Sequence, residues 1–163
     1  MNAATQADTG PWFCPRQGAG SLVAVLSNNY YELPRASDVS LEFLIDGQVL
    51  FSSTGRWLHP LFELEQFLKT REVDASQGEI HDKVVGRGSA FLMVRLGVRK
   101  AHAGLLSRLG QDVLTRAGVA CTWDVLVDEI ECQTESILRE ITDPEAAYPI
   151  LAERARKARA RAF

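Results

Sequence analysis

The sequence predicts a single domain of the α/β class, a three-layer arrangement in which a mixed sheet has helices on both faces. Residues 40–53 alternate apolar and polar side chains around an Asp-Gly pair, which is the pattern of a β-hairpin. Residues 98–123 follow the strand, helix, strand pattern of a right-handed parallel crossover. The length of 163 residues, of which 46% are hydrophobic and 24% charged, suits one domain that needs no disulfide or metal for its stability.

The first half of the domain begins with this hairpin. Both faces of its strands are partly apolar, which suits a sheet that is covered on both sides. The segment 60–69 is predicted to be a helix because apolar residues share one stripe and Pro60 stands at its start, where a missing N–H costs nothing. The segment 70–80 is polar, and we expect a surface loop there.

A second helix is predicted at 82–96, with Asp82 as its N-cap. It carries few charges, so we expect it to be mostly buried. Gly86 and Gly88 would lie inside this helix, where each costs roughly 1 kcal/mol relative to alanine. Close packing of the helix on the sheet would explain why two glycines stand there.

The second half of the domain alternates strands and helices. Gly118 follows the third helix, as glycine commonly does at a helix C-terminus, and an Asp-Pro-Glu segment marks the start of the last one. The predicted elements are a strand at 98–106, a helix at 107–117, a strand at 119–123, a short helix at 135–141 and a final helix from about residue 144.

Composition divides the chain into three parts. Residues 1–37 are predicted to be a flexible leader that could include a docked short strand, because they are rich in glycine and turn-forming residues. Residues 38–155 form the α/β domain, and residues 156–163 form a basic tail.

Several segments of the domain resemble an uncharacterised prokaryotic family, known as domain of unknown function 1893. They are the hairpin LEFLIDGQVLFSS, the segment HDKVVG at 81–86, the segment ECQTE at 131–135 and the segment TDPEAAY at 142–148. The resemblance covers about residues 38–155. It implies a cytidine-deaminase-like fold and brings no established activity with it. Where the family has Cys-Pro-Met-Glu, this chain has Cys-Gln-Thr-Glu.

The motifs of zinc-dependent deamination are absent from the sequence. That chemistry needs a His-X-Glu segment and a Pro-Cys-X-X-Cys segment, which hold the zinc and a proton-carrying glutamate. Lys83 stands where the glutamate would follow His81, and Cys121 and Cys132 are eleven residues apart. We therefore expect no zinc site and no cofactor, while the question of whether the chain is an enzyme stays open.

The leading functional hypothesis is a small anionic or nucleotide-like ligand at the start of the helix 82–96. A helix start offers free N–H groups and a positive dipole end, and a nearby lysine and arginine would add charge. A plain cap with a solvated first turn is the alternative. A histidine at a strand end is also a candidate, because open α/β sheets bind ligands there. The ligand-binding candidates are His81, Asp82, Lys83, Gly86, Arg87 and His102.

The candidates for catalytic roles are Asp82, Cys132 and Glu135. If Cys132 precedes the short helix, the helix dipole would favour its thiolate, and Glu135 could reach back to the cap. A capping role with a small buried thiol is one alternative. A metal site that joins Cys132 to His81 or His102 is another.

The charge distribution favours a second functional hypothesis, a non-catalytic interaction or regulatory domain. The chain has a formal charge of −3, yet its last twelve residues hold five basic residues and one acidic residue. A protein partner could bind this tail, whereas nucleic acid is disfavoured because no aromatic residues are interspersed. Three scattered cysteines and the lack of a membrane-length apolar run or a secretory pattern predict a cytoplasmic protein. Association of identical copies stays open.

Overall fold

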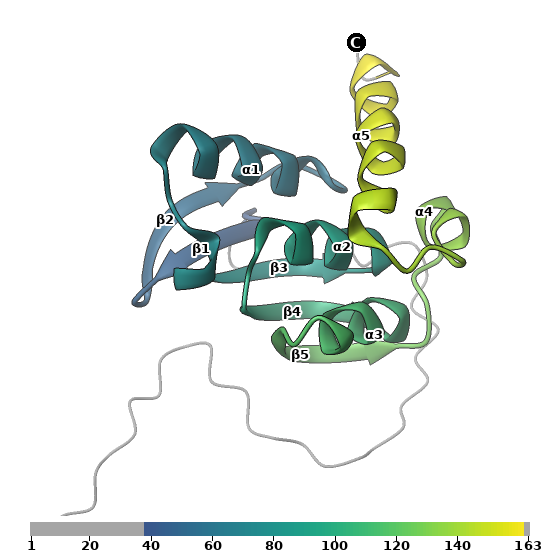
Figure 1. Cartoon of the computed structure of the whole chain (residues 1–163), viewed down its shortest axis with the longest axis horizontal. Coiled ribbons are helices and arrows are strands. Elements are labelled where there is room, and N and C mark those ends of the chain that lie inside the picture. The colour runs from purple at the N-terminus through teal and green to yellow at the C-terminus, as the bar shows by residue number, and fades with distance from the viewer. Residues whose placement is uncertain (1–37, 162–163) are drawn as a thin grey trace, which may run out of the picture.

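The computed structural model describes residues 38–161, so the leader 1–37 and the last two residues of the tail lie outside the described residues. Strands and helices alternate along this part of the chain (Figure 1). The elements are β1 (Leu41–Ile45), β2 (Gln48–Ser53), α1 (His59–Arg71), the 3-10 turn η2 (Ala75–Gln77), β3 (Glu79–Val85), α2 (Arg87–Leu96), β4 (Lys100–Ser107), α3 (Arg108–Arg116), β5 (Ala120–Val127), α4 (Gln133–Ile137) and α5 (Pro144–Arg161).

The strands form one mixed sheet in the order β2-β1-β3-β4-β5. Strand β1 is antiparallel to both of its neighbours, whereas β3, β4 and β5 are parallel. The crossover helices α2 and α3, which connect the parallel strands, lie side by side (Figure 1). The predicted α/β class with a mixed sheet is therefore confirmed, and the deaminase-like architecture stays a prediction.

The hairpin forms where the sequence predicted it. Asp46 has a φ of 50° and Gly47 a φ of 76°, so both central residues adopt the left-handed conformation that this tight turn requires. Phe43 of β1 is fully buried, while Val49 and Leu50 of the edge strand β2 remain about half exposed.

Strand β3 is the largest departure from the sequence prediction. The helix predicted at 82–96 begins only at Arg87, and the residues before it form the strand Glu79–Val85. This strand pairs with β1 on one side and with β4 on the other, and its β-branched residues are buried. Backbone pairing on both sides and β-branched side chains outweigh the helix pattern here. Gly86 ends the strand and serves as the N-cap of α2.

Helix α2 is the centre of the helical packing, since it contacts α1, α3, α4 and α5. A Cβ atom on Gly88 would lie 3.1 Å from a methyl carbon of Thr134 in α4 and 3.2 Å from one of Leu151 in α5. Gly88 thus permits the close approach that the sequence suggested. The neighbours are the later helices and not the sheet.

A buried carboxylate joins three of these helices. Glu65 of α1 is only 4% exposed, and it accepts hydrogen bonds from Arg95 Nη1 at 2.7 Å, Lys69 Nζ at 2.9 Å and Tyr148 Oη at 2.9 Å. Burial raises the pKa of Glu65, but these hydrogen bonds outweigh burial and hold its pKa below the usual value. The Arg95 guanidinium also lies 3.6 Å from the centre of the Tyr148 ring. Arg95 and Tyr148 therefore tie α2 and α5 to α1.

Helix α5 starts as predicted, with the Asp143 carboxylate accepting a hydrogen bond from Glu145 N at 3.1 Å. Ala147, Leu151 and Ala155 are its buried residues, and the helix then extends away from the rest of the domain (Figure 1). Among residues 38–161, no helix has the length and apolar character needed to cross a membrane.

Candidate functional site

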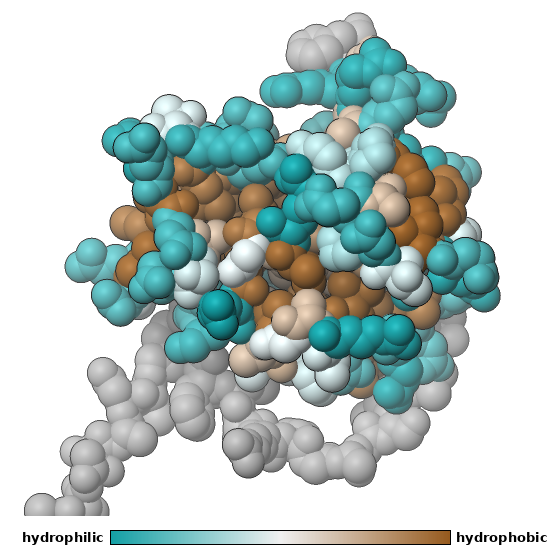
Figure 2. Space-filling model, in the orientation of Figure 1, coloured by the Kyte–Doolittle hydropathy of each residue, from teal (hydrophilic) through white to brown (hydrophobic). Residues whose placement is uncertain are grey.

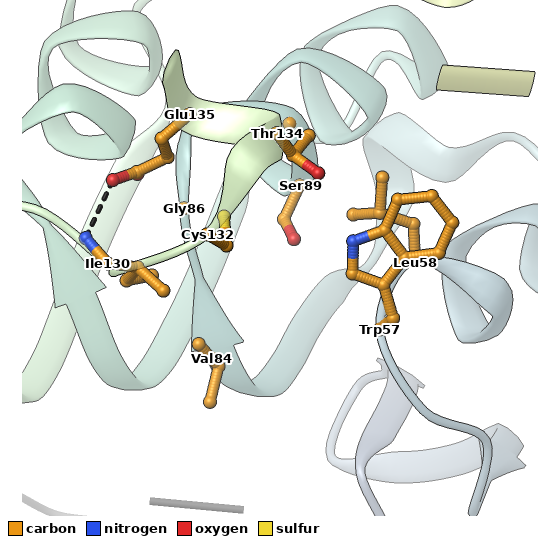
Figure 3. A pocket seen from close by; sticks show the side chains of 10 residues that line it. Trp57, Leu58, Val84, Gly86, Ser89, Ile130, Cys132, Thr134 and Glu135 are labelled. Atoms are coloured by element: carbon orange, nitrogen blue, oxygen red, sulfur yellow. Dashed lines mark hydrogen bonds between the residues drawn. The ribbon is translucent and has the colours of Figure 1, made fainter. Parts of the chain in front are cut away.

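A cavity lies at the start of α2, where several segments that are distant in sequence meet (Figure 3). The loop before α1 contributes Trp57, and the end of β3 contributes Gly86. The first turn of α2 contributes Ser89, and the segment around the start of α4 contributes Cys132 and Thr134. The cavity therefore lies at the observed helix start, Arg87, and not at the predicted start near residue 82.

Glu135 lines one side of this cavity, and its carboxylate accepts hydrogen bonds from groups of the protein itself. It is 3% exposed and accepts hydrogen bonds from Arg87 N at 3.0 Å, from Ile130 N at 2.7 Å and from the Ser107 hydroxyl (Figure 3 shows the bond to Ile130). The Ser107 oxygen in turn accepts from Gly110 N at 3.0 Å and so caps α3. One carboxylate thus joins the starts of α2 and α3 to the segment before α4.

The sequence predicted that Glu135 would reach back to the cap of its own helix. Cys132 is the N-cap residue of α4, because this helix begins at Gln133 and not at the predicted residue 135, but its side chain makes no capping hydrogen bond. The carboxylate bonds to Ile130 N, two residues before the cap, and to the starts of two other helices. Glu135 is therefore a structural group in this arrangement, because its oxygens already accept from three donors.

Gly86 leaves room for this carboxylate. A Cβ atom at Gly86 would lie 2.9 Å from Glu135 Oε1 and 3.1 Å from the terminal carbon of Ile130. Both distances are shorter than ordinary contacts, so a side chain at this position would displace Glu135 from the start of α2.

Two hydroxyl groups that line the cavity form no hydrogen bond within the described residues, and their oxygens are open to solvent. Ser89 is 5% exposed and Thr134 is 4% exposed, and among residues 38–161 neither hydroxyl forms a protein hydrogen bond. Figure 3 shows the Ser89 oxygen directed toward the space between Cys132 and the Trp57 indole. The cavity thus presents hydrogen-bonding capacity that the protein does not use.

Trp57 borders the opposite side of this space and has an unusual backbone. Its φ of 58° lies in the left-handed region, which is costly for a bulky residue and which is found most often at functional sites. The edge of its ring contacts His59, with 5.9 Å between the ring centres. Trp57, Ser89 and Thr134 are not among the residues that the sequence predicted for the site. A correct helix start at residue 87 would have placed Ser89 in the first turn.

Three of the predicted ligand-binding residues lie in strand β3, not at a helix start. Asp82 was predicted to cap the helix, but its carboxylate accepts from Val84 N at 3.2 Å within the strand. Lys83 donates its backbone N–H to the Ser40 carbonyl at 2.9 Å as part of the pairing with β1. These residues and His81 do not line the cavity at the start of α2.

The two predicted histidines pair with each other across the parallel strands β3 and β4. The rings of His81 and His102 are 5.6 Å apart in an edge-to-face arrangement. His81 Nε2 lies 3.0 Å from a Glu79 oxygen, and His102 Nδ1 lies 2.9 Å from the Thr122 hydroxyl. Within residues 38–161, no three His, Cys, Asp or Glu side chains gather in a way that could hold a metal ion.

The remaining predicted residue, Arg87, directs its side chain away from this cavity. Its guanidinium lies over the Phe91 ring at 5.3 Å from the ring centre, and its Nη2 donates to the Ile141 carbonyl at 2.6 Å. Of the eight predicted site residues, the structure brings Gly86, Cys132 and Glu135 together at the start of α2.

The two cysteines of the described part differ in setting. Cys132 lines the cavity and is partly exposed. Cys121 lies in β5, and burial raises the pKa of its thiol to about 11, so it stays protonated at neutral pH.

The fold and site define an α/β protein with a mixed sheet and a small cavity at a helix start. The chain belongs to the family described as domain of unknown function (DUF1893), whose model matches residues 35–155. It is similar in structure to a DUF1893 family protein (TM1506) from Thermotoga maritima, with a TM-score of 0.65 and 20% sequence identity over 83% of this chain and 97% of that one. No curated protein matches the sequence. At this identity the likeness shows the fold alone.

Proposed function

We propose that this chain binds a small nucleotide-like molecule in the cavity at the start of α2. The observation that carries the proposal is the pair of unpartnered hydroxyls, on Ser89 and Thr134, within the described residues. A hydroxyl that forms no bond within the protein and stays open to the cavity is free to bond with water or with a ligand. A ligand with polar ring atoms would supply the partners that the protein does not.

The charge around the cavity favours a neutral polar ring over a bare anion in this place. Among residues 38–161, no lysine or arginine side chain lines the cavity, and the Glu135 carboxylate already accepts from the first N–H of α2. A second negative charge beside that carboxylate would be repelled. The enclosed volume is only about 30 Å³, so a planar ring such as a nucleobase would lie at the open side of the cavity, against the apolar surface of the Trp57 indole.

The proposal concerns binding and assigns no reaction. Cys132 lines the cavity and would contact the ligand, whereas Glu135 would keep the helix start in place. Lys83 and the two histidines, which were predicted to contact a ligand at this helix start, have no part in it.

The test is thermal stabilisation of the full chain by adenosine, guanosine, cytidine and uridine. Ser89→Ala and Thr134→Val remove the two hydroxyls with little change in shape, and Ser136→Ala removes an exposed hydroxyl of α4 as a matched control. We expect one nucleoside to raise the Tm of the wild type and the control but not of the double variant. If no nucleoside raises the Tm, or if the double variant responds as the wild type does, the proposal fails.

The exposed end of α5 supports a second function, the interaction with an acidic protein partner. Every residue from 156 to 161 is exposed, and hydrophilic residues cover this end of the helix (Figure 2). Arg156 and Lys157 pair with Glu153, while Arg159 and Arg161 have no such partner within the described residues. The test is capture of a partner from an extract of the source cells. An Arg159→Ala, Arg161→Ala variant should lose that partner, and equal capture by the variant would reject this function.

A further inference from the structure

A second cavity lies on the other side of α2, between α2, α3 and the segment before α5. Its α2 wall is made by Arg87, Phe91 and Val94, which share one stripe of the helix because they are spaced by four and three residues. Ser89 points into the first cavity from the opposite stripe. The two cavities are therefore separate, and neither proposal depends on the other.

Arg87 carries a buried positive charge that the described part of the protein leaves unbalanced. The residue is 6% exposed, and its Nη2 donates to the Ile141 carbonyl. Its Nε is buried and has no hydrogen-bond partner, and among residues 38–161 no carboxylate lies within ion-pair distance of the guanidinium. Buried arginine is normally paired with an anion, since an isolated charge is costly away from water.

The other polar groups of this cavity do not supply that anion. Asp112 and Arg116 line it from α3, but they pair with each other at 2.9 Å and are both largely exposed. Thr142 contributes a hydroxyl, which carries no charge. The three charged residues together leave one net positive charge, and Arg87 holds it at the buried side of the cavity.

The rest of the cavity wall is apolar. Phe91, Val94, Val113, Ala117 and Pro144 form it. A bare inorganic anion would leave these surfaces without contact, whereas an organic acid would cover them. Burial of such apolar surface adds about 25 cal/mol for each Å² removed from water.

We propose that this second cavity binds a small monocarboxylic acid with an apolar body. One carboxylate oxygen accepts from Arg87 Nε, and the other accepts from a terminal N–H of the guanidinium that is not bonded to Ile141. This is the fork geometry that arginine offers to two oxygens. The apolar body lies against Phe91, Val113 and Pro144. One carboxylate matches the single net positive charge of the cavity.

The experiment titrates the full chain with benzoate, with the neutral isostere benzamide and with inorganic phosphate, followed by calorimetry and by amide NMR shifts. Hydrogen bonds to a charged group are worth enough that Arg87→Met should weaken benzoate binding at least about tenfold. Arg139→Gln, which removes an arginine that lies outside the cavity and pairs with Glu129, should bind benzoate as the wild type does. Benzamide and phosphate should bind much more weakly than benzoate.

Four results would overturn the proposal. Benzoate could fail to bind the wild type, or bind Arg87→Met equally well. Benzamide could bind as tightly as benzoate, which would make the cavity a simple apolar site. Phosphate could bind more tightly than benzoate, which would make it an inorganic-anion site. If Arg87→Met does not fold, Arg116→Glu is used in its place. Arg116 is exposed, and its replacement by glutamate reverses the charge at the cavity mouth. This substitution should weaken benzoate binding by a similar factor.

Discussion

Replacement of Glu135 by glutamine tests the role that the structure gives to this buried carboxylate. All three of its partners are donors, namely the backbone N–H groups of Arg87 and Ile130 and the hydroxyl of Ser107. Glutamine has nearly the same shape, but one of its two terminal groups is itself a donor. At least one partner in Glu135→Gln would therefore face an N–H group and not an oxygen.

The magnitude follows from the count of these bonds. Hydrogen bonds to a charged acceptor contribute about 1.5–3 kcal/mol, and those to a neutral acceptor about 0.5–1.5 kcal/mol. Two bonds would weaken by about 1 kcal/mol each, and the buried donor left without an acceptor would cost about 1–3 kcal/mol more. We expect Glu135→Gln to lower the free energy of unfolding by about 3–5 kcal/mol, a large part of a typical domain's stability.

Urea unfolding followed by circular dichroism measures this loss from the shift in midpoint at unchanged slope. Glu140→Gln is the matched control, because Glu140 is exposed and follows α4 closely in the sequence. The control should change stability by less than about 0.5 kcal/mol. If Glu135→Gln lowered the free energy of unfolding by no more than the control does, the structural role of the carboxylate would be refuted.

Other predictions concern Gly86 and Ser89 near the start of α2, the Glu65 carboxylate and the Cys121 thiol. Gly86→Ala should destabilise the chain by about 1–3 kcal/mol, because its Cβ would press on Glu135 at 2.9 Å; an unchanged urea midpoint would contradict this. Ser89→Ala should leave the free energy of unfolding of the ligand-free chain within about 0.5 kcal/mol of the wild type, since no hydrogen bond within the protein is lost. A larger loss of stability would show that the Ser89 hydroxyl has a hydrogen-bond partner in the protein. The pKa of Glu65 is lowered from 4.5, so its stabilising effect is complete above that value and is lost as the pH falls through the lower, folded-state pKa. Acid titration of Glu65→Gln should accordingly show less loss of stability below about pH 4.5 than the wild type does, and identical acid curves would refute this. Cys121 should resist alkylation by iodoacetamide at pH 8 because its pKa is about 11, as peptide mass spectrometry would show; rapid labelling would contradict its burial.

The elements that could be predicted from sequence are those with local causes. Asp46 and Gly47 specify their turn because both must adopt a positive φ, and Asp143 with Pro144 specifies the start of α5. The segment Glu79–Val85 has no such local cause. It is a strand because β1 and β4 pair with it, and those partners lie far away in the sequence. Its residues were therefore assigned to the end of a loop and the start of a helix.

The site was predicted in part for the same reason. Local pattern predicted a short helix at 135–141, whereas the helix runs from Gln133 to Ile137 and Cys132 directly precedes it. The partners of Glu135 lie 28 and 48 residues away along the chain, so no spacing rule could assign its bonds to Ser107 and Arg87. Family resemblance drew attention to the right segments, but only the fold shows that Glu135 serves the structure while Ser89 faces the cavity.

The position of Glu135 in the chain has a consequence for the order of folding. Strands β3, β4 and β5 with their crossover helices form one uninterrupted stretch of chain, so their contacts close short loops. The bonds from Arg87 and Ser107 to Glu135 can form only after the starts of α2 and α3, which supply the donors, are in place. We therefore expect these bonds to be weak or absent in the folding transition state. The loss of stability in Glu135→Gln would then appear as faster unfolding, with the refolding rate almost unchanged.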